Sequence, residues 1–305
     1  MNTNAKSPVD RLPVVTARWT WRDRLGAFAV RWNVGRSQYR VAPGLYATGK
    51  PTQNSPVLVT ANYKLTFDRL RQALPGIDAW ILVLNTRGIN VWCAAGKGTF
   101  GTDELVKKIR SARLASVVKH ATVILPQLGA PGVAAHEVTR QTGFSVVYGP
   151  VRAADIPAFL RAGMQCTPAM RRATFPVAER LALVPVELMQ RLGPALGVWL
   201  FFLLLAALRK GGLDGLAGTC YRLTLGAGGV FLAGTVLVPA LLPWLPGRAL
   251  AVKGAVVGLG VGLVPVAAGL VTPASGAGFL LLAMAACSYL GLMFTGSTHY
   301  TSASG

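Results

Sequence analysis

Four long apolar stretches in the last third of the chain constrain its fold most strongly. They cover residues 193–208, 223–246, 249–271 and 277–295 and are interrupted mainly by Gly and Pro. The later ones are long enough to cross a bilayer as helices. Of the 31 Lys and Arg residues in the chain, five lie after Gly193, together with one of the 11 acidic residues. We therefore predict a basic domain outside the membrane, followed by an α-helical transmembrane domain over residues 193–305.

Residues 171–192, which precede these stretches, mix charged and apolar side chains. Glu179, Arg180, Glu187 and Arg191 lie among apolar residues, a pattern typical of an amphipathic helix at a membrane interface. We predict an amphipathic linker helix here, and four spans in all, or five if this segment also crosses. Basic residues flank the first span on both sides, so the positive-inside rule leaves the orientation of the spans open.

The amino-terminal segment, residues 1–40, lacks the apolar core of a secretory signal. We therefore expect the first domain to stay in the cytoplasm and the spans to lie in the inner (cytoplasmic) membrane.

Short apolar strands alternate with amphipathic helices over residues 51–170. The predicted strands are 57–60, 80–84, 122–125 and 144–148, and the predicted helices are 64–74, 102–112 and 132–141. Strands that are apolar throughout predict an α/β fold with a Rossmann-like, mostly parallel sheet covered on both faces. Residues 1–50 are basic and rich in aromatic residues, Pro and Gly, without sustained periodicity. We predict that they form a basic N-terminal arm packed against this domain, with the regular alternation of strands and helices beginning after Pro51.

Polar or Gly-rich segments follow every predicted strand. They are residues 60–62, 85–97, 126–132 and 149–150. Because ligands of parallel sheets bind beyond the carboxyl ends of the strands, we expect these segments to converge on one rim and to form the binding site.

The octapeptide Asn90–Lys97 (NVWCAAGK) contains Cys93, the only cysteine that precedes Cys166. Asn90 is predicted to cap a short helix, which makes Cys93 the third helical residue, where unpaired N–H groups and the helix dipole favour a thiolate. The three small residues after Cys93 would let a broad, flat ligand approach the backbone, with Trp92 packed beside it. The segment therefore predicts a cap helix over residues 90–97 that binds a cofactor rather than a substrate.

Other motifs in this domain are weaker. Gly96–Gly101 spells G-x-G-x-x-G, but a Cys-bearing helix precedes it, and Lys119-His120 stand where a dinucleotide site needs an acidic residue. His136 with Glu137 could form an acid–base or metal pair, although an ordinary helix face explains them as well. A Cys–His hydrolase would need a histidine beside Cys93, which the sequence cannot place.

Cysteine spacing and charge limit the remaining possibilities. The four cysteines, at positions 93, 166, 220 and 287, form no C-x-x-C pair, so we predict no iron–sulfur cluster held by this chain. The net charge is +20, and Arg and Trp interleave between residues 18 and 40. No signature of a nucleic-acid-binding module is present, so we attribute this basic surface to the lipid bilayer or a partner and not to nucleic acid.

The octapeptide resembles the cap-helix signature of the HgcA family, the corrinoid proteins of microbial mercury methylation. The order of the two domains also resembles that family, over roughly residues 40–302. The sheet domain is similar, in addition, to the corrinoid domain of the acetyl-CoA pathway's corrinoid iron–sulfur protein, which lacks the Cys-bearing cap helix and brings its own cluster-binding cysteines. Further segments that resemble the HgcA family are residues 55–64 (SPVLVTANYK), 79–101, 125–138, 148–157 and 294–302.

This resemblance implies a cofactor, a reaction and partners. The cofactor is a cobalamin-type corrinoid whose cobalt takes Cys93 as its lower axial ligand, which makes Cys93 both the catalytic and the metal-binding residue. The reaction transfers a methyl group from Cys-ligated methylcobalt to Hg(II) and gives methylmercury. The implied partners are a ferredoxin-like iron–sulfur electron donor of the HgcB type and a pterin-dependent methyl donor. By position, the candidates for holding the corrin ring and its tail are Thr60, Asn62, Asn90, Trp92, Cys93, Ala94, Ala95, Gly96, Lys97, Gln127, Gly129 and Ala130.

Two other functions stay open. The chain could be a corrinoid methyl carrier or redox protein of one-carbon metabolism in the acetyl-CoA pathway that does not act on mercury. It could also be a membrane protein that senses a corrinoid or a metal without turnover.

Overall fold

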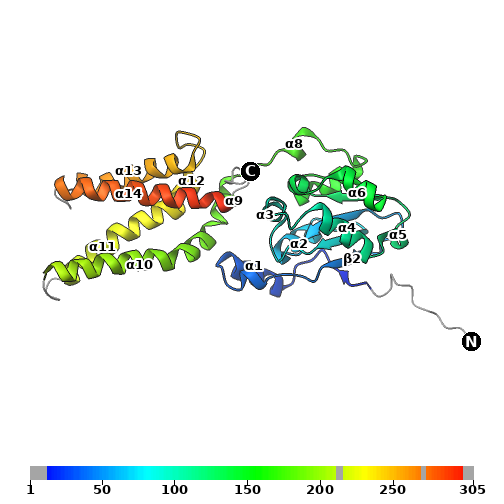
Figure 1. Cartoon of the computed structure of the whole chain (residues 1–305), viewed down its shortest axis with the longest axis horizontal. Helices are drawn as coiled ribbons and strands as arrows, with labels where there is room; N and C mark the ends of the chain where they lie inside the picture. Colours follow the sequence, from blue (N-terminus) through cyan, green and yellow to red (C-terminus); the bar gives the residue numbers. More distant parts are fainter. Residues whose placement is uncertain (1–11, 211–215, 269–272, 298–305) are drawn as a thin grey trace, which may run out of the picture. The chain divides into compact units, whose positions relative to one another are not determined.

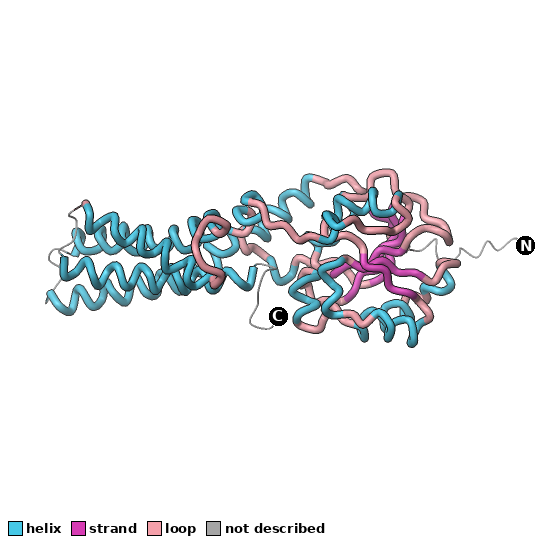
Figure 2. Tube along the Cα trace, turned by 90° about the horizontal axis from the view of Figure 1, so that it is seen from above, coloured by secondary structure: helices cyan, strands magenta, loops and turns pink. Residues whose placement is uncertain are grey.

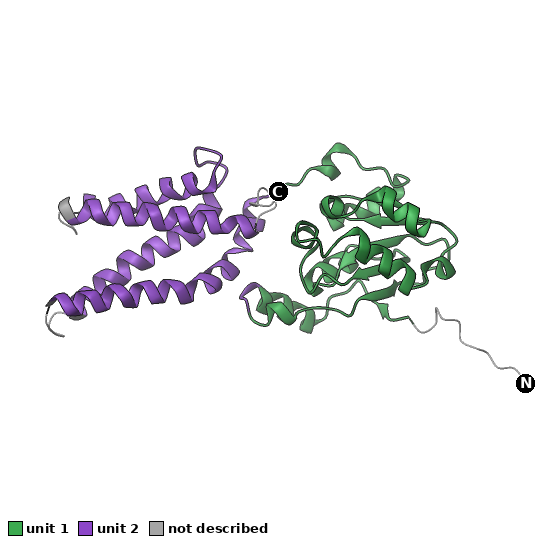
Figure 3. Ribbon diagram, viewed as in Figure 1, with its two compact units in different colours: residues 1–30, 34–174 green, residues 31–33, 175–305 purple. Residues whose placement is uncertain are grey.

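The computed structural model describes residues 12–210, 216–268 and 273–297. The chain divides into two compact units, which Figure 3 shows in different colours. Unit 1 comprises residues 1–30 and 34–174, and unit 2 comprises residues 31–33 and 175–305. Unit 1 is the α/β part, and unit 2 consists of helices, as the sequence predicts (Figure 2).

A six-stranded, mostly parallel sheet forms the centre of unit 1. Its strands lie in the order β1-β2-β4-β3-β5-β6. The strands are β1 (Val14–Val15), β2 (Gly44–Thr48), β3 (Val57–Ala61), β4 (Ala79–Leu84), β5 (Thr122–Leu125) and β6 (Ser145–Tyr148). The last four run parallel to one another, whereas β2 pairs with β4 in antiparallel register. The order of the chain reverses between β3 and β5, and this switch point is where a doubly wound sheet offers a crevice for ligands.

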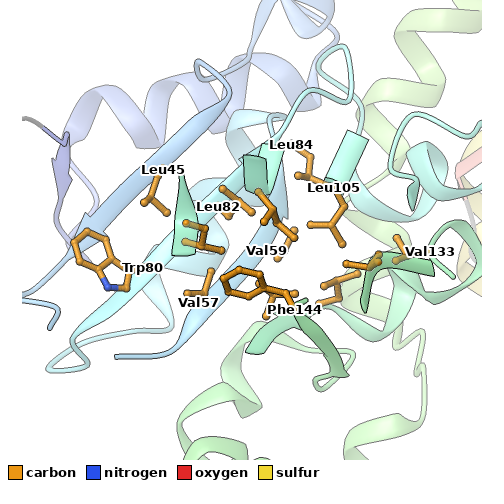
Figure 4. Packing of buried hydrophobic residues seen from close by; sticks show 14 of the residues in the cluster. Leu45, Val57, Val59, Trp80, Leu82, Leu84, Leu105, Val133 and Phe144 are labelled. Carbon is orange, nitrogen blue, oxygen red and sulfur yellow. The ribbon is translucent and has the colours of Figure 1, made fainter. Parts of the chain in front are cut away.

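Helices cover both faces of this sheet (Figure 1). Along β4, Leu82 and Leu84 belong to one buried cluster, and Ile81 and Val83 belong to the other. Because successive side chains of a strand point to opposite faces, an unbroken apolar run such as β4 is buried on both sides. Figure 4 shows the first cluster, in which Leu84 lies near Leu105 of helix α4 (Thr102–Ser111).

Short loops and 3-10 turns separate the helices of unit 1. The helices and turns are α1 (Trp21–Arg31), η2 (Arg36–Gln38), α2 (Lys64–Gln72), α3 (Val91–Gly96), α4 (Thr102–Ser111), α5 (Leu114–Val117), η3 (Gln127–Gly132), α6 (Ala135–Thr142), η4 (Ala153–Asp155), α7 (Ile156–Arg161) and α8 (Pro168–Arg171). The strands and helices predicted between residues 57 and 148 are all present, with ends shifted by a few residues.

Regular structure also occurs before Pro51, within the predicted arm. Residues 44–48 form β2, which pairs with β4 along its whole length, and residues 21–31 form α1. The apolar run of β2 is only three residues long, Leu45–Ala47, and it lies between β1 and the buried β4 in the sheet. Part of the predicted arm, residues 1–11, lies outside the described residues.

Unit 2 contains four helical stretches that are long and apolar enough to cross a membrane: residues 177–209, 217–241, 250–267 and 275–296. This agrees with the four predicted spans, and in the described part of the chain no fifth stretch of this kind occurs. The elements of unit 2 are α9 (Val177–Leu181), α10 (Val184–Lys210), α11 (Leu216–Leu232), the π-helical turn η5 (Ala233–Leu237), α12 (Val238–Leu241), α13 (Leu250–Ala267), α14 (Pro273–Met293) and η6 (Phe294–Ser297). Residues 298–302 of the segment that resembles the HgcA family lie outside the described residues.

The predicted linker, residues 171–192, contains the short helix α9 and the start of α10. The helix α10 begins at Val184 and continues without interruption into the first apolar stretch. Glu187 and Arg191 lie one turn apart on it, with 3.8 Å between their charged groups. An ion pair at this spacing stabilises a helix, so α10 can continue from its charged first turns into the apolar stretch that follows.

Glycines let two helices of unit 2 approach closely. Gly254, Gly258 and Gly262 of α13 follow one another at every fourth residue and face α14. A side chain at Gly254 or Gly258 would collide with the backbone of α14 near Cys287 and Ala283. Such small residues at four-residue spacing are the usual contact surface between helices in membranes.

Candidate functional site

The segments that follow β3, β4 and β5 meet at the carboxyl edge of the parallel strands, as the sequence predicts. Asn62 follows β3, the loop Asn85–Asn90 and helix α3 follow β4, and η3 follows β5. Since these strands run parallel, their carboxyl ends lie on one edge, and α3 packs against η3 there. We call this edge, with α3 and η3, the rim.

Asn62 fixes the loop that leads into α3. Its side-chain oxygen accepts hydrogen bonds from the backbone N–H groups of Thr86 (3.1 Å) and Gly88 (2.9 Å). Arg87 and Gly88 both adopt positive φ angles, 58° and 78°, so the loop makes a turn that most residues disfavour. Asn62 is only 2% exposed, as is Thr60 within β3. Both predicted site residues therefore lie beneath the rim, where they can support it from below.

Helix α3 begins as the sequence predicts. The Asn90 side chain accepts a hydrogen bond from the Cys93 N–H at 2.9 Å, and Cys93 is the third helical residue. This bond satisfies one of the free donors at the helix start and fixes the position of Cys93.

The two faces of α3 differ in burial. Val91, Ala94 and Ala95 are buried in the first cluster, with Ala94 fully inaccessible. Trp92 and Cys93 are half-buried, and Gly96 and Lys97 are exposed. Ala94 and Ala95 thus let the helix approach the sheet core, whereas Cys93 and its outward neighbours form the accessible surface.

The pKa of the Cys93 thiol is higher than that of an exposed cysteine. Burial raises it, and this effect exceeds the opposing influence of Lys97, Asn90 and Arg36. The predicted stabilisation of a thiolate by the helix start is therefore not sufficient by itself. A bound cation would displace the proton, because metal coordination deprotonates a thiol outright.

The packing of α3 on η3 decides where a flat group fits. Gly129 and Gly132 are closed in, because a side chain at Gly129 would collide with the ring of Phe100 and one at Gly132 would lie 3.1 Å from Ala95. In contrast, Gly96 and Gly98 have no atom within 4 Å of an added side chain. The residues present therefore fit a broad group against the outward surface of α3, and the space between α3 and η3 is filled by protein.

Residues of η3 lie at the edge of this surface. Gln127 and Ala130 are half-buried, whereas Gly129 is buried beside Phe100. The Gln127 side-chain oxygen accepts a hydrogen bond of 3.0 Å from Arg171. Of the three predicted site residues on η3, Gln127 and Ala130 are thus partly accessible, and Gly129 serves the packing of the turn.

The N-terminal segment contributes residues to the rim that the sequence analysis did not include in the site. Arg40 bridges to Tyr63, and the Val41 N–H donates to the Asn62 carbonyl at 3.0 Å. This pairing brings Arg36 close enough to Cys93 to influence its pKa, and the Arg36 guanidinium lies 5.6 Å from the centre of the Tyr63 ring. Because the pairing joins segments that are distant in the sequence, no local pattern could reveal it.

The two histidines of unit 1 lie elsewhere. His120 uses both ring nitrogens, one 2.9 Å from the Ser55 carbonyl and the other accepting from the Thr122 N–H at 3.3 Å. It lines a hollow of about 670 Å³ near the amino ends of β3 and β5, the opposite edge of the sheet. His136 is exposed on α6. Within the described ranges, no group of three or more His, Cys, Asp or Glu residues could hold a metal ion.

Comparisons with known proteins match the part of the chain that contains the rim. Residues 31–160 match the family described as CO dehydrogenase/acetyl-CoA synthase delta subunit. The acetyl-CoA decarbonylase/synthase complex subunit gamma of Methanopyrus kandleri is 33% identical over 127 residues, which are 41% of this chain and 27% of the relative. The corresponding subunit of Archaeoglobus fulgidus is 32% identical over 127 residues, with the same shares covered. The corrinoid/iron-sulfur protein large subunit of Moorella thermoacetica is 32% identical over 127 residues, 41% of this chain and 28% of the relative.

This chain thus spans little more than a quarter of the length of these relatives. The expected relationship to the corrinoid proteins of the acetyl-CoA pathway is confirmed for residues 31–160. The narrower resemblance to the HgcA family stays a prediction.

Proposed function

We propose that this chain is a membrane-anchored corrinoid protein that carries methyl groups, with Cys93 as the lower axial ligand of the cobalt. The observation that carries the proposal is the placement of Cys93, half-buried on the outward face of a capped helix, within the segment 31–160 that resembles corrinoid proteins. When bound, the corrinoid would supply a cobalt centre able to accept and release a methyl group.

Each residue of the rim has a distinct role in this proposal. Asn90 fixes the start of α3, and Asn62 holds the loop before it. The open space over Gly96 admits the corrin ring, and Trp92 packs beside it. Lys97 and Arg36 place positive charge near Cys93, which suits anionic groups of a cofactor tail.

The remaining predicted residues are proposed as supports or tail contacts. Ala94 and Ala95 seat α3 on the core, and Thr60 supports the rim from below. Gln127 and Ala130 are proposed to contact the tail, with Gly129 allowing their turn to pack on Phe100. We also propose residues 51–170 as the corrinoid-binding domain and residues 193–305 as the membrane domain.

The four apolar helical stretches support a multi-pass membrane protein. We propose that it lies in the inner membrane, with the corrinoid-binding domain in the cytoplasm. The relatives named above are subunits of larger systems, which supports partners here also. We propose a ferredoxin-like electron donor of the HgcB type and a pterin-dependent methyl donor.

The acceptor of the methyl group separates two candidate functions. The relatives favour a carrier for one-carbon metabolism of the acetyl-CoA pathway. A thiolate ligand at Cys93 favours Hg(II) as the substrate, since it donates more electron density than imidazole or water and so promotes transfer to a soft acceptor. Mercury methylation is the second candidate on this ground.

The first test is the visible spectrum of the full chain in lipid nanodiscs after reconstitution with a corrinoid. We expect a cobalt band that depends on thiolate in the wild type, and its loss in Cys93→Ala. Cys166→Ala is the matched control, since Cys166 is also half-buried in unit 1 but lies outside the rim, and it should leave the band unchanged. Folded wild-type protein that takes up no corrinoid would disprove the proposal.

The second test follows a labelled methyl group in a single turnover. Faster transfer to Hg(II) than to an acceptor of the acetyl-CoA pathway would establish mercury methylation, and the opposite order would establish the one-carbon carrier. Absence of transfer to either would favour a sensor.

A further inference from the structure

Helix α1 carries an exposed apolar stripe on the side that faces away from helix α2 of unit 1. Trp21 is 65% exposed, Leu25 57% and Phe28 61%. Their spacing of four and three residues places them on one line along the helix. A contiguous stripe of this kind is unusual on a surface that only water covers.

The opposite face of α1 is firmly attached to the domain. Ala27 and Val30 are buried, at 2% and 1% exposure. Asp23 accepts charged hydrogen bonds from Lys64 (2.6 Å) and Arg71 (2.8 Å), both of helix α2. The stripe therefore belongs to a helix whose opposite face is fixed to the domain. It is not a core-facing surface that is exposed because the helix has come away from the domain.

The exposed charge on α1 is entirely positive. Asp23 is the helix's one acidic residue, and it is buried and paired. Arg22 lies on one flank of the stripe, with its guanidinium 5.5 Å from the centre of the Trp21 ring, and Arg24 and Arg31 lie on the other flank. Apolar and aromatic residues flanked by arginines are the pattern of a helix that lies in a membrane interface.

We propose that α1 docks on the anionic surface of a lipid bilayer, with Trp21, Leu25 and Phe28 inserted below the headgroups and the flanking arginines on lipid phosphates. The same chain carries four helical stretches able to span a bilayer. Because α1 is covalently linked to them, a bilayer that they cross would be close to α1. Each arginine near an anionic leaflet should shift the docking equilibrium about fivefold, or about 1 kcal/mol.

The test is photocrosslinking of the full chain in nanodiscs of phosphatidylcholine, with or without phosphatidylglycerol. The photoreactive p-benzoylphenylalanine replaces Phe28 in one sample. In the matched control it replaces Lys107, an exposed residue on helix α4 of the same unit. We expect lipid adducts by mass spectrometry at position 28, more with phosphatidylglycerol, and only background adducts at position 107.

A charge-reversed variant, Arg22→Glu with Arg24→Glu, should lose lipid adducts at position 28 by about tenfold or more. Both arginines are exposed, so the fold should survive, and unchanged hydrogen exchange of β4 amides would verify this. Crosslinks from position 28 to a second copy or to helices of the same chain, without lipid adducts, would overturn the proposal. Equal lipid adducts at positions 28 and 107 would overturn it as well.

Discussion

Strand β4 of unit 1 and helix α14 of unit 2 are both almost wholly apolar, yet they expose their side chains very differently. Leu82 of β4 is fully buried, whereas Leu281 of α14 is 67% exposed. The first lies in a core that excludes water, and the second has the exposure that suits a lipid environment. Apolar composition therefore predicts burial only where the surrounding solvent is water.

The residues that pack also differ between the two regions. Unit 1 fills its core with large side chains such as Trp80, Phe100 and Phe159. In unit 2, Gly254 and Gly258 bring the backbones of two helices together. Lipid gives no hydrophobic drive for helices to associate, so in a membrane close backbone contact would add to the side-chain burial around Val238 and Cys287.

The largest expected effect comes from the same substitution made in both regions. Leu82→Ala should destabilise unit 1 by about 3 kcal/mol, because it removes buried contacts and leaves a cavity. Leu281→Ala should change the stability of unit 2 by less than about 1 kcal/mol. Hydrogen exchange of β4 and α14 amides in nanodiscs measures both values. Equal losses would break the comparison.

Close backbone contact in unit 2 is tested by two glycines on α13. Gly258→Val should destabilise the α13–α14 pair by about 2 kcal/mol, since the added side chain meets the backbone of α14. Gly260→Val is the matched control, because no atom lies within 4 Å of its added side chain. Thermal unfolding in the same lipid compares the two, and a similar shift for both would refute packing through small residues.

Helix α1 belongs to unit 1 but presents an apolar surface like that of unit 2. Its attachment to helix α2 should depend on pH, because it involves the carboxylate of Asp23. Burial alone would raise the pKa of Asp23, but hydrogen bonds from Lys64, Thr20 and Arg71 lower it well below its usual range. A folded-state pKa below the unfolded value stabilises the fold above about pH 4, and this contribution disappears as the pH falls further. Hydrogen-exchange protection of α1 should therefore decrease in acid.

The variant Asp23→Asn should lose about 1.5 kcal/mol of this protection already at neutral pH. It should also show a weaker acid transition than the wild type. Asp103→Asn, at an exposed position on α4, should leave α1 unchanged. If α1 of the wild type stays equally protected at pH 2 and pH 7, the ion pairs do not hold it.

The smallest expected effect on stability is at the candidate site itself. Cys93→Ala should change the unfolding free energy of unit 1 by less than about 1 kcal/mol, because the side chain is half-buried on the outer face of α3. Ala94→Val, one residue further and fully buried, should cost about 1–3 kcal/mol. Denaturant unfolding of the full chain compares them. A larger loss for Cys93→Ala would mean that this cysteine belongs to the core.

Local sequence patterns were sufficient to predict much of the fold and the position of Cys93 in the candidate site. The apolar runs of β3, β4 and β5 and the four membrane-length helices follow directly from composition and length. The Asn90 cap and the position of Cys93 also follow, because a cap depends on residues within three positions of each other. The strand β2 did not follow, since its partner β4 is distant in the sequence and follows it only after β3 and α2.

The sequence by itself determined that a parallel α/β sheet precedes a set of apolar helices, and that Cys93 occupies the first turn of a capped helix. Only the tertiary structure decided which side of α3 is accessible, that Asn62 supports the rim, and that Arg36 lies near Cys93. The physical reason is the range of the interactions. Periodicity and capping act within one turn or strand, whereas burial and the pKa of a thiol depend on segments that meet only when the chain has folded.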